Sequence, residues 1–122
     1  MERLVAGTNS LNLYLRDTGR WGIFTFSGDE QPGNADLLTI LEALKAATAG
    51  LNKPVAFQVA AVPYPNSRLL SAVIGLLTTA DDLPRRLALV GASQTWLDML
   101  DILGVRSAFL FFDDVEEITF ED

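Results

Sequence analysis

The sequence has 122 residues, of which 49% are apolar, and its 9 basic and 16 acidic residues give a formal charge of −7. This length is sufficient for one domain with a hydrophobic core. Because the sequence contains no cysteine and no histidine, disulfides, thiolate or imidazole catalysis and cysteine-ligated metal sites are excluded. The net negative charge disfavours broad electrostatic binding to nucleic acid or to anionic lipid surfaces.

No segment indicates targeting or membrane insertion. The start of the sequence, Met1 to Val5, is not followed by the pattern of a secretion signal, which has a basic start, a long apolar stretch and a small-residue cleavage site. The uncharged stretches over residues 54–67 and 69–80 are shorter than the roughly 18 apolar residues of a membrane helix. We therefore expect a cytoplasmic protein, or a soluble component attached to a membrane machine, with no direct insertion.

The first predicted elements are two strands that form a hairpin. Leu11 to Arg16 alternates apolar and polar residues, which is typical of a strand with one buried face. The turn residues Asp17 to Arg20 follow, and Trp21 to Phe26 is rich in the aromatic and β-branched residues that favour strands. The two strands and their short connection predict an antiparallel pair.

A helix is predicted after the loop formed by residues 27–33. Asn34 is the expected N-cap, and Asp36 lies in the first turn, where the helix dipole favours a carboxylate. Apolar residues recur at helical spacing until Gly50, which is expected to end the helix. These residues are Leu37, Leu38, Ile40, Leu41 and Leu44.

The second half of the chain alternates predicted strands and helices. The expected strands are Val55 to Val62, Leu87 to Val90 and Ala108 to Phe112, and the expected helices are Ser67 to Ala80 and Gln94 to Leu103, with a short helix at Val115 to Ile118. Asp81 to Pro84 closes the second helix, and Gly91 to Ser93 forms a tight turn before the third. In that third helix, Trp96 and Met99 to Leu103 are expected to belong to the core.

This alternation favours a mainly parallel sheet, because each helix returns the chain so that the next strand runs in the same direction. The opening hairpin makes the sheet mixed. We therefore predict one α/β domain over residues 1–122, with a mixed sheet of about five strands and three to four helices.

Paired carboxylates and glycines are the first candidates for chemistry. Adjacent acids occur at Asp29-Glu30, Asp81-Asp82, Asp113-Asp114 and Glu116-Glu117. Buried pairs can act as acid and base, and Asp113-Asp114 could bind magnesium, but neighbouring acids in loops are usually solvated. Residues 28–33 match neither glycine pattern of phosphate-binding loops. No catalytic residue, cofactor or metal ion is therefore expected.

The segment between the third strand and the second helix is the strongest candidate site. Loops beyond the carboxyl ends of strands are where α/β sheets usually bind ligands and partners. Asn66 or Ser67 can cap the helix, and a phosphate on Ser67 would be stabilised by the free N–H groups there. Tyr64 lies between two prolines. It is either a stiff aromatic that contacts a protein partner or a lid over the core.

The chain as a whole resembles a STAS domain, the module of sulfate transporters and bacterial anti-sigma factor antagonists. The resemblance covers about residues 9 to 118. It rests on the hairpin ending in Phe26-Ser27-Gly28-Asp29, the helix opened by Asn34-Ala35, the strand, turn and helix around Asn66 to Gly75, and the tail LALVGASQTWLDMLDILGVRSAFLFFDDVEEI from Leu87 to Ile118.

This resemblance implies a switch controlled by phosphorylation. In anti-sigma factor antagonists, a partner kinase phosphorylates a Ser or Thr at the start of the second helix. The unphosphorylated form binds that kinase and thereby releases a sigma factor. The family turn usually reads Asp-Ser-Ser/Thr-Gly-Leu, whereas this sequence reads Asn66-Ser67-Arg68-Leu69-Leu70. Arg68 occupies the phosphoacceptor place and cannot accept phosphate, so Ser67 would be the phosphoacceptor only if the turn shifted by one residue.

The sequence therefore predicts a non-catalytic protein–protein interaction module that resembles an anti-sigma factor antagonist in bacterial signalling or transcription regulation and lacks the usual switch. Tyr64, Asn66, Ser67 and Arg68 are the expected docking residues, and the expected partner is an anti-sigma factor kinase. One alternative is a soluble STAS accessory subunit that binds a transporter subunit. Another is a small carboxylate-dependent enzyme or nucleotide-binding domain. Homodimerisation through the apolar helix over residues 69–77 is left open.

Overall fold

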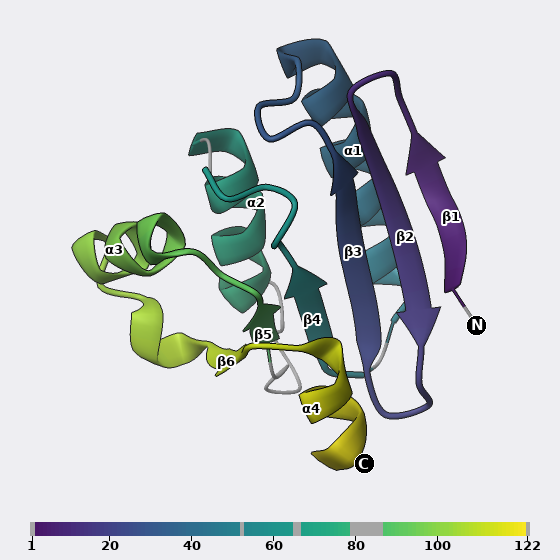
Figure 1. The fold of residues 1–122 in the computed structure, drawn as a ribbon. Coiled ribbons are helices and arrows are strands. Elements are labelled where there is room, and N and C mark those ends of the chain that lie inside the picture. The colour runs from purple at the N-terminus through teal and green to yellow at the C-terminus, as the bar shows by residue number, and fades with distance from the viewer. Residues whose placement is uncertain (1, 52, 65–66, 79–86, 122) are drawn as a thin grey trace.

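A computed structural model describes residues 2–51, 53–64, 67–78 and 87–121 of the chain. Within these ranges the structure has one six-stranded sheet, four α-helices and one 3-10 helix (Figure 1). The strands are β1 (Glu2–Gly7), β2 (Leu11–Asp17), β3 (Gly22–Gly28), β4 (Val55–Gln58), β5 (Leu87–Val90) and β6 (Leu110–Phe112). The helices are α1 (Asn34–Ala49), α2 (Ser67–Thr78), α3 (Gln94–Ile102), η1 (Arg106–Ala108) and α4 (Val115–Glu121).

The order of the strands in the sheet is the order of the strands in the chain. β1, β2 and β3 pair antiparallel, whereas β3, β4, β5 and β6 pair parallel, and a helix precedes each of the last three strands. This arrangement confirms the predicted α/β class, the mixed sheet and the opening hairpin. It contains one strand more than the five predicted.

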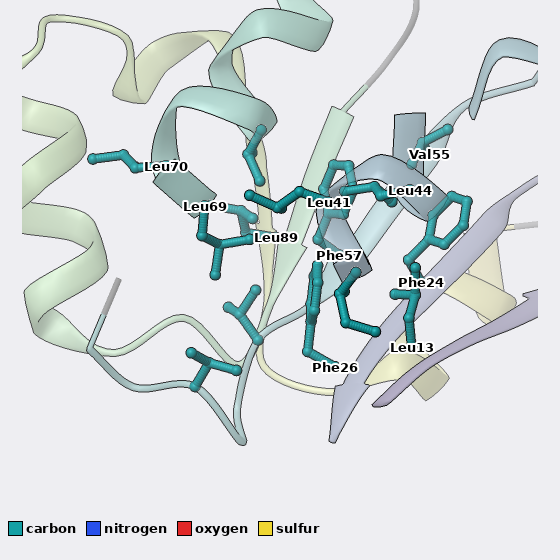
Figure 2. Close-up of a cluster of buried hydrophobic side chains, with 14 of the residues drawn as sticks. Leu13, Phe24, Phe26, Leu41, Leu44, Val55, Phe57, Leu69, Leu70 and Leu89 are labelled. Carbon is teal, nitrogen blue, oxygen red and sulfur yellow. The ribbon is translucent and has the colours of Figure 1, made fainter. Parts of the chain in front are cut away.

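The larger core lies between the sheet and the helices α1, α2 and α3. Alternate strand residues point to this side, as the two-residue period of a strand requires. Phe57 of β4 stacks against Phe24 and Phe26 of β3, with ring centroids 6.0 and 6.5 Å apart. Leu41 of α1 and Leu69 of α2 lie in the same cluster (Figure 2). Three helices and four strands are thus held together by one continuous apolar cluster.

A smaller core lies on the opposite face, which α4 covers in part. Its buried members are Trp21, Ile23, Ala56, Ala88, Val90 and Ile118, with Phe112 and Val115 packed against them. Ile118 of α4 is fully buried. The helical turn predicted over residues 115–118 is confirmed, and it continues to Glu121.

The strand β1 was not predicted, and a β-bulge explains why. The pairing of β1 with β2 shifts register between Leu4 and Ala6. As a result, the adjacent residues Val5 and Ala6 both pack against the larger core, which breaks the apolar–polar alternation that indicates a strand.

Several predicted boundaries are corrected by the structure. β4 ends at Gln58 rather than Val62, because the chain turns there and the Val62 N–H donates to the Val59 carbonyl at 3.0 Å. β6 begins at Leu110 rather than Ala108, because Ala108 belongs to η1. The N-cap of α1 is Gly33 and not Asn34. α2 is described to Thr78, so its predicted end at Ala80 and the closing segment 81–84 lie outside the described residues.

The end of α3 also differs from the prediction. Trp96 and Leu100 are fully buried, as expected, but Ile102 and Leu103 are exposed. Trp96 and Leu100 are four residues apart and share one helix face. Ile102 follows Leu100 by two residues, which places it about 200° around the helix axis and therefore on the solvent side.

The start of α1 is tied to the turn between β1 and β2. The Asp36 carboxylate accepts hydrogen bonds from the backbone N–H and the hydroxyl of Ser10, at 3.0 and 2.6 Å. The Ser10 hydroxyl in turn accepts a bond from the N–H of Gly33 at 3.1 Å. These bonds, chiefly the one from the Ser10 side chain, hold the pKa of Asp36 below its ordinary value of 3.8.

We expect the stability of the fold to depend on the ionisation of Asp36. Because its folded-state pKa is lowered, the ionised carboxylate contributes stability that is present above pH 3.8 and is lost as the pH falls through the folded-state value. Acidification should therefore lower the melting temperature of the parent chain more than that of Asp36→Asn. The measurement is thermal unfolding at pH 7 and at about pH 3. Glu42→Gln, which changes an exposed acid of the same helix, is the control and should behave like the parent.

Candidate protein-docking site

The candidate site is the segment that leaves the carboxyl end of β4 and enters α2. β3, β4 and β5 are parallel, so their carboxyl ends lie on the same side of the molecule. The connections to α1, α2 and α3 begin there (Figure 1). Open α/β sheets usually bind ligands beyond the carboxyl ends of their strands, where the strand order reverses, and the order of this sheet does not reverse. The fold places the described docking residues, Tyr64, Ser67 and Arg68, in the connection beyond the carboxyl end of β4.

The first part of the segment is held by α3 and by the residue that caps it. The indole Nε1–H of Trp96 donates to the Val62 carbonyl at 2.8 Å, and the Ser93 hydroxyl donates to the Pro63 carbonyl at 2.6 Å. Ser93 is also the N-cap of α3, because its oxygen accepts a bond from the Trp96 N–H at 3.3 Å. Since Trp96 is fully buried, these bonds fix the position of the backbone that precedes Tyr64.

The neighbouring turn between β5 and α3 makes close contact with the same segment. Gly91 has a φ of +69°, and a Cβ at this position would lie 2.9 Å from the Cβ of Ala60. Glycine alone satisfies both the left-handed backbone and this close approach without strain. The predicted tight turn at residues 91–93 is thus confirmed, and it supports the candidate site from one side.

Three of the four predicted docking residues lie in the described part of the chain, and all three are exposed. Tyr64 is 54% exposed, which favours the interpretation as a contact residue over that of a lid. Ser67 and Arg68 are exposed in the first turn of α2, while the next two residues, Leu69 and Leu70, are buried and anchor the helix. Asn66 lies outside the described residues.

The carboxylate pairs of the described residues lie at the surface. Asp29-Glu30, Asp113-Asp114 and Glu116-Glu117 are exposed, and Asp81-Asp82 lies outside the described residues. Within the described ranges, no group of three or more acidic residues is placed to hold a metal ion. Asp114 and Glu117 instead accept bonds from the backbone N–H groups of Glu116 and Asp113, at 3.1 and 3.3 Å. These contacts organise the start of α4.

Sequence reasoning did not assign Ser93 and Trp96 to the candidate site. Two signals were available. A buried tryptophan needs an acceptor for its indole N–H, and a serine before a helix is a typical N-cap. Neither signal shows which carbonyl is bound, because Val62 and Trp96 are brought together only by the packing of α3 beside the end of β4.

The comparisons with known proteins leave the family open: the sequence matches no protein-family model and no curated protein. Among the described residues, the helices are all too short or too polar to cross a membrane.

Proposed function

We propose that this chain is a non-catalytic interaction module of the STAS type, resembling an anti-sigma factor antagonist, and that the turn over residues 62–70 docks a protein partner. The observation that carries the proposal is the exposure of Tyr64, Ser67 and Arg68, after a backbone that Trp96 and Ser93 hold at Val62 and Pro63. An exposed aromatic ring that follows a fixed backbone segment loses less conformational entropy on binding than one on a mobile segment.

The side chains of this turn suit a protein partner. Tyrosine and arginine are among the residues that contribute most to protein interfaces, because each combines a large contact area with hydrogen-bonding groups. Arg68 adds an exposed positive charge, which fits an acidic group on the partner. The order of elements, a hairpin followed by alternating helices and parallel strands, is also the order on which the resemblance to STAS domains rests.

We further propose that docking is constitutive. Arg68 stands at the phosphoacceptor place of the family turn, and its guanidinium cannot accept a phosphate. Ser67 lies one residue earlier, at the first position of α2. A cytoplasmic anti-sigma factor kinase is the proposed partner. It would be bound without being released by phosphorylation of the turn.

Substitution of the turn residues should reduce partner capture. We expect Tyr64→Ala and Arg68→Ala each to lower the recovery of the partner about tenfold or more in affinity purification from the native cell, which corresponds to the loss of about 1.4 kcal/mol or more of binding free energy. Arg20→Ala is the matched control. It removes another exposed arginine, which lies in the turn that leads into the amino end of β3.

The same purification distinguishes the alternatives. Identification of the captured protein by mass spectrometry should give a kinase-like anti-sigma factor, whereas a transporter subunit would support the accessory-subunit alternative. Undiminished capture by both turn variants would contradict the docking surface. Stoichiometric phosphate on Ser67 after incubation with the captured kinase would contradict constitutive docking. A rise in melting temperature with nucleotides or divalent metals would favour the small-enzyme or nucleotide-binding alternative.

A further inference from the structure

The two edges of the sheet differ in how they are protected against pairing with another strand. The edge strand β1 carries the charged residues Glu2 and Arg3, and a bulge at Val5 interrupts it. Charges and bulges are the features by which natural sheets avoid edge-to-edge association. The opposite edge strand, β6, has the sequence Leu-Phe-Phe, with no charge, proline or bulge. Of the protective features named here, β6 has only its short length of three residues.

Backbone groups at the centre of β6 are directed away from the sheet. The N–H of Gly91 donates to the Phe112 carbonyl at 2.9 Å, so the backbone of Phe112 faces β5. Alternate residues of a strand direct their backbone groups to the same side. Leu110 therefore also faces β5, and the N–H and C=O of Phe111 point outward from the edge of the sheet.

Exposed apolar side chains are frequent in β6 and in the segment that leads to it. Seven large hydrophobic side chains of the described residues are exposed, and four of them lie in the segment from the end of α3 to β6. They are Ile102, Leu103, Leu110 and Phe111, with exposed fractions of 77, 50, 37 and 37%. α3, η1 and β6 follow one another at this margin of the molecule (Figure 1). We call the two that belong to β6, Leu110 and Phe111, the β6-edge patch.

Charges are distributed asymmetrically along β6. Before the strand, Arg106 binds Asp101 at 2.8 Å and lies over the ring of Phe111, with its guanidinium carbon 6.0 Å from the ring centroid. After the strand come the exposed acids Asp113 and Asp114. An antiparallel neighbour of the same sequence, centred on Phe111, would place its Asp113 opposite Phe109 and its Asp114 opposite Ala108, toward the end of β6 that carries Arg106. A parallel neighbour would instead place acids beside acids.

We propose that β6 pairs antiparallel with β6 of a second copy of this chain, about a two-fold axis at Phe111. The outward N–H and C=O of the two Phe111 residues would then form a pair of hydrogen bonds. The β6-edge patch would be buried, and the acidic end of each β6 would lie toward the end of the other that carries Arg106. A self-complementary surface of this kind is what a two-fold dimer requires. This interface is separate from the docking turn, so it does not depend on the proposed function.

Measurement of the molecular mass by light scattering and sedimentation tests the proposal. The mass should rise with concentration from 13.3 kDa toward twice that value. Phe111→Lys should raise the dissociation constant of the dimer about tenfold or more, because it places a charge at the centre of the interface. Leu4→Lys changes an exposed side chain on the opposite edge strand and should leave the dimer unchanged. Circular dichroism should show that both variants are folded.

A charge exchange provides a second, independent readout. Arg106→Asp alone should weaken the dimer, because it places an acid at the end of β6 that faces the acidic end of the other copy. The addition of Asp113→Lys in the same chain should restore the dimer, since opposite charges would again face one another between the two copies. A mass of 13.3 kDa at all concentrations would overturn the proposal. So would a dimer that tolerates Phe111→Lys, or one that Leu4→Lys weakens equally. Failure of the double variant to recover would overturn the antiparallel arrangement.

Discussion

The Trp96→Ala variant is expected to have a free energy of unfolding about 3–5 kcal/mol lower than that of the parent chain. Trp96 is fully buried in the larger core, so truncation removes its apolar contacts and leaves a cavity. It also removes the donor to the Val62 carbonyl. Urea unfolding measures the change. Because folded domains are stable by only about 5–15 kcal/mol, this substitution should remove a large part of the total stability.

Trp96→Phe separates the hydrogen bond from the packing. Phenylalanine keeps an aromatic ring in the core but leaves the buried Val62 carbonyl without its donor, which costs about 1–3 kcal/mol. Because that bond holds the segment before Tyr64, the same variant should also weaken partner capture. A Trp96→Phe variant as stable as the parent would show that the bond at 2.8 Å makes no net contribution.

The Gly28→Ala variant should lose about 3 kcal/mol or more of stability, because it combines an unfavourable backbone conformation with a steric clash. Gly28 has a φ of +145°, and a Cβ there would lie 2.3 Å from the Ser10 carbonyl oxygen and 2.9 Å from the Leu11 Cα. Both are backbone atoms, so they cannot move aside as a side chain can. Relief would require separating the paired residues Leu11 and Gly28.

Gly19→Ala is the matched control for this substitution. Gly19 also has a positive φ, of +96°, but nothing lies within 4 Å of its Cβ position. Its cost should be about 1–2 kcal/mol, from backbone strain alone. Urea unfolding of both variants isolates the contribution of the close approach to Ser10. Equal losses for the two variants would show that the turn between β1 and β2 moves to accommodate the new methyl group.

Sequence patterns predicted most of the fold because most elements bury one regular face. β2 alternates apolar and polar residues, and β5 is apolar throughout, so both were located correctly. β1 escaped prediction because its bulge places two adjacent residues against the core. The exposure of the last residues of α3 was not predicted. Their apolar character indicates that the helix packs against the core, but not which of these residues face solvent.

The position of the candidate site could be predicted from the sequence, but the contacts that hold it could not. The prolines around Tyr64 and the capping residues near Ser67 mark the turn, and its exposure is as expected for the described residues. The bonds from Ser93 and Trp96 join positions 30 and 34 residues apart in the chain. Such contacts depend on the angle at which α3 packs beside β4, which local patterns do not determine.

The order of the strands has a consequence for how the molecule folds. Each strand pairs with the strand next to it in the chain, so every pairing closes a single connection between consecutive strands. Closing short loops costs less chain entropy than bringing distant segments together, and proteins rich in local contacts fold faster than those that depend on distant ones. The hairpin of β2 and β3 can thus form first and serve as a template, to which the following helix–strand units are added one at a time.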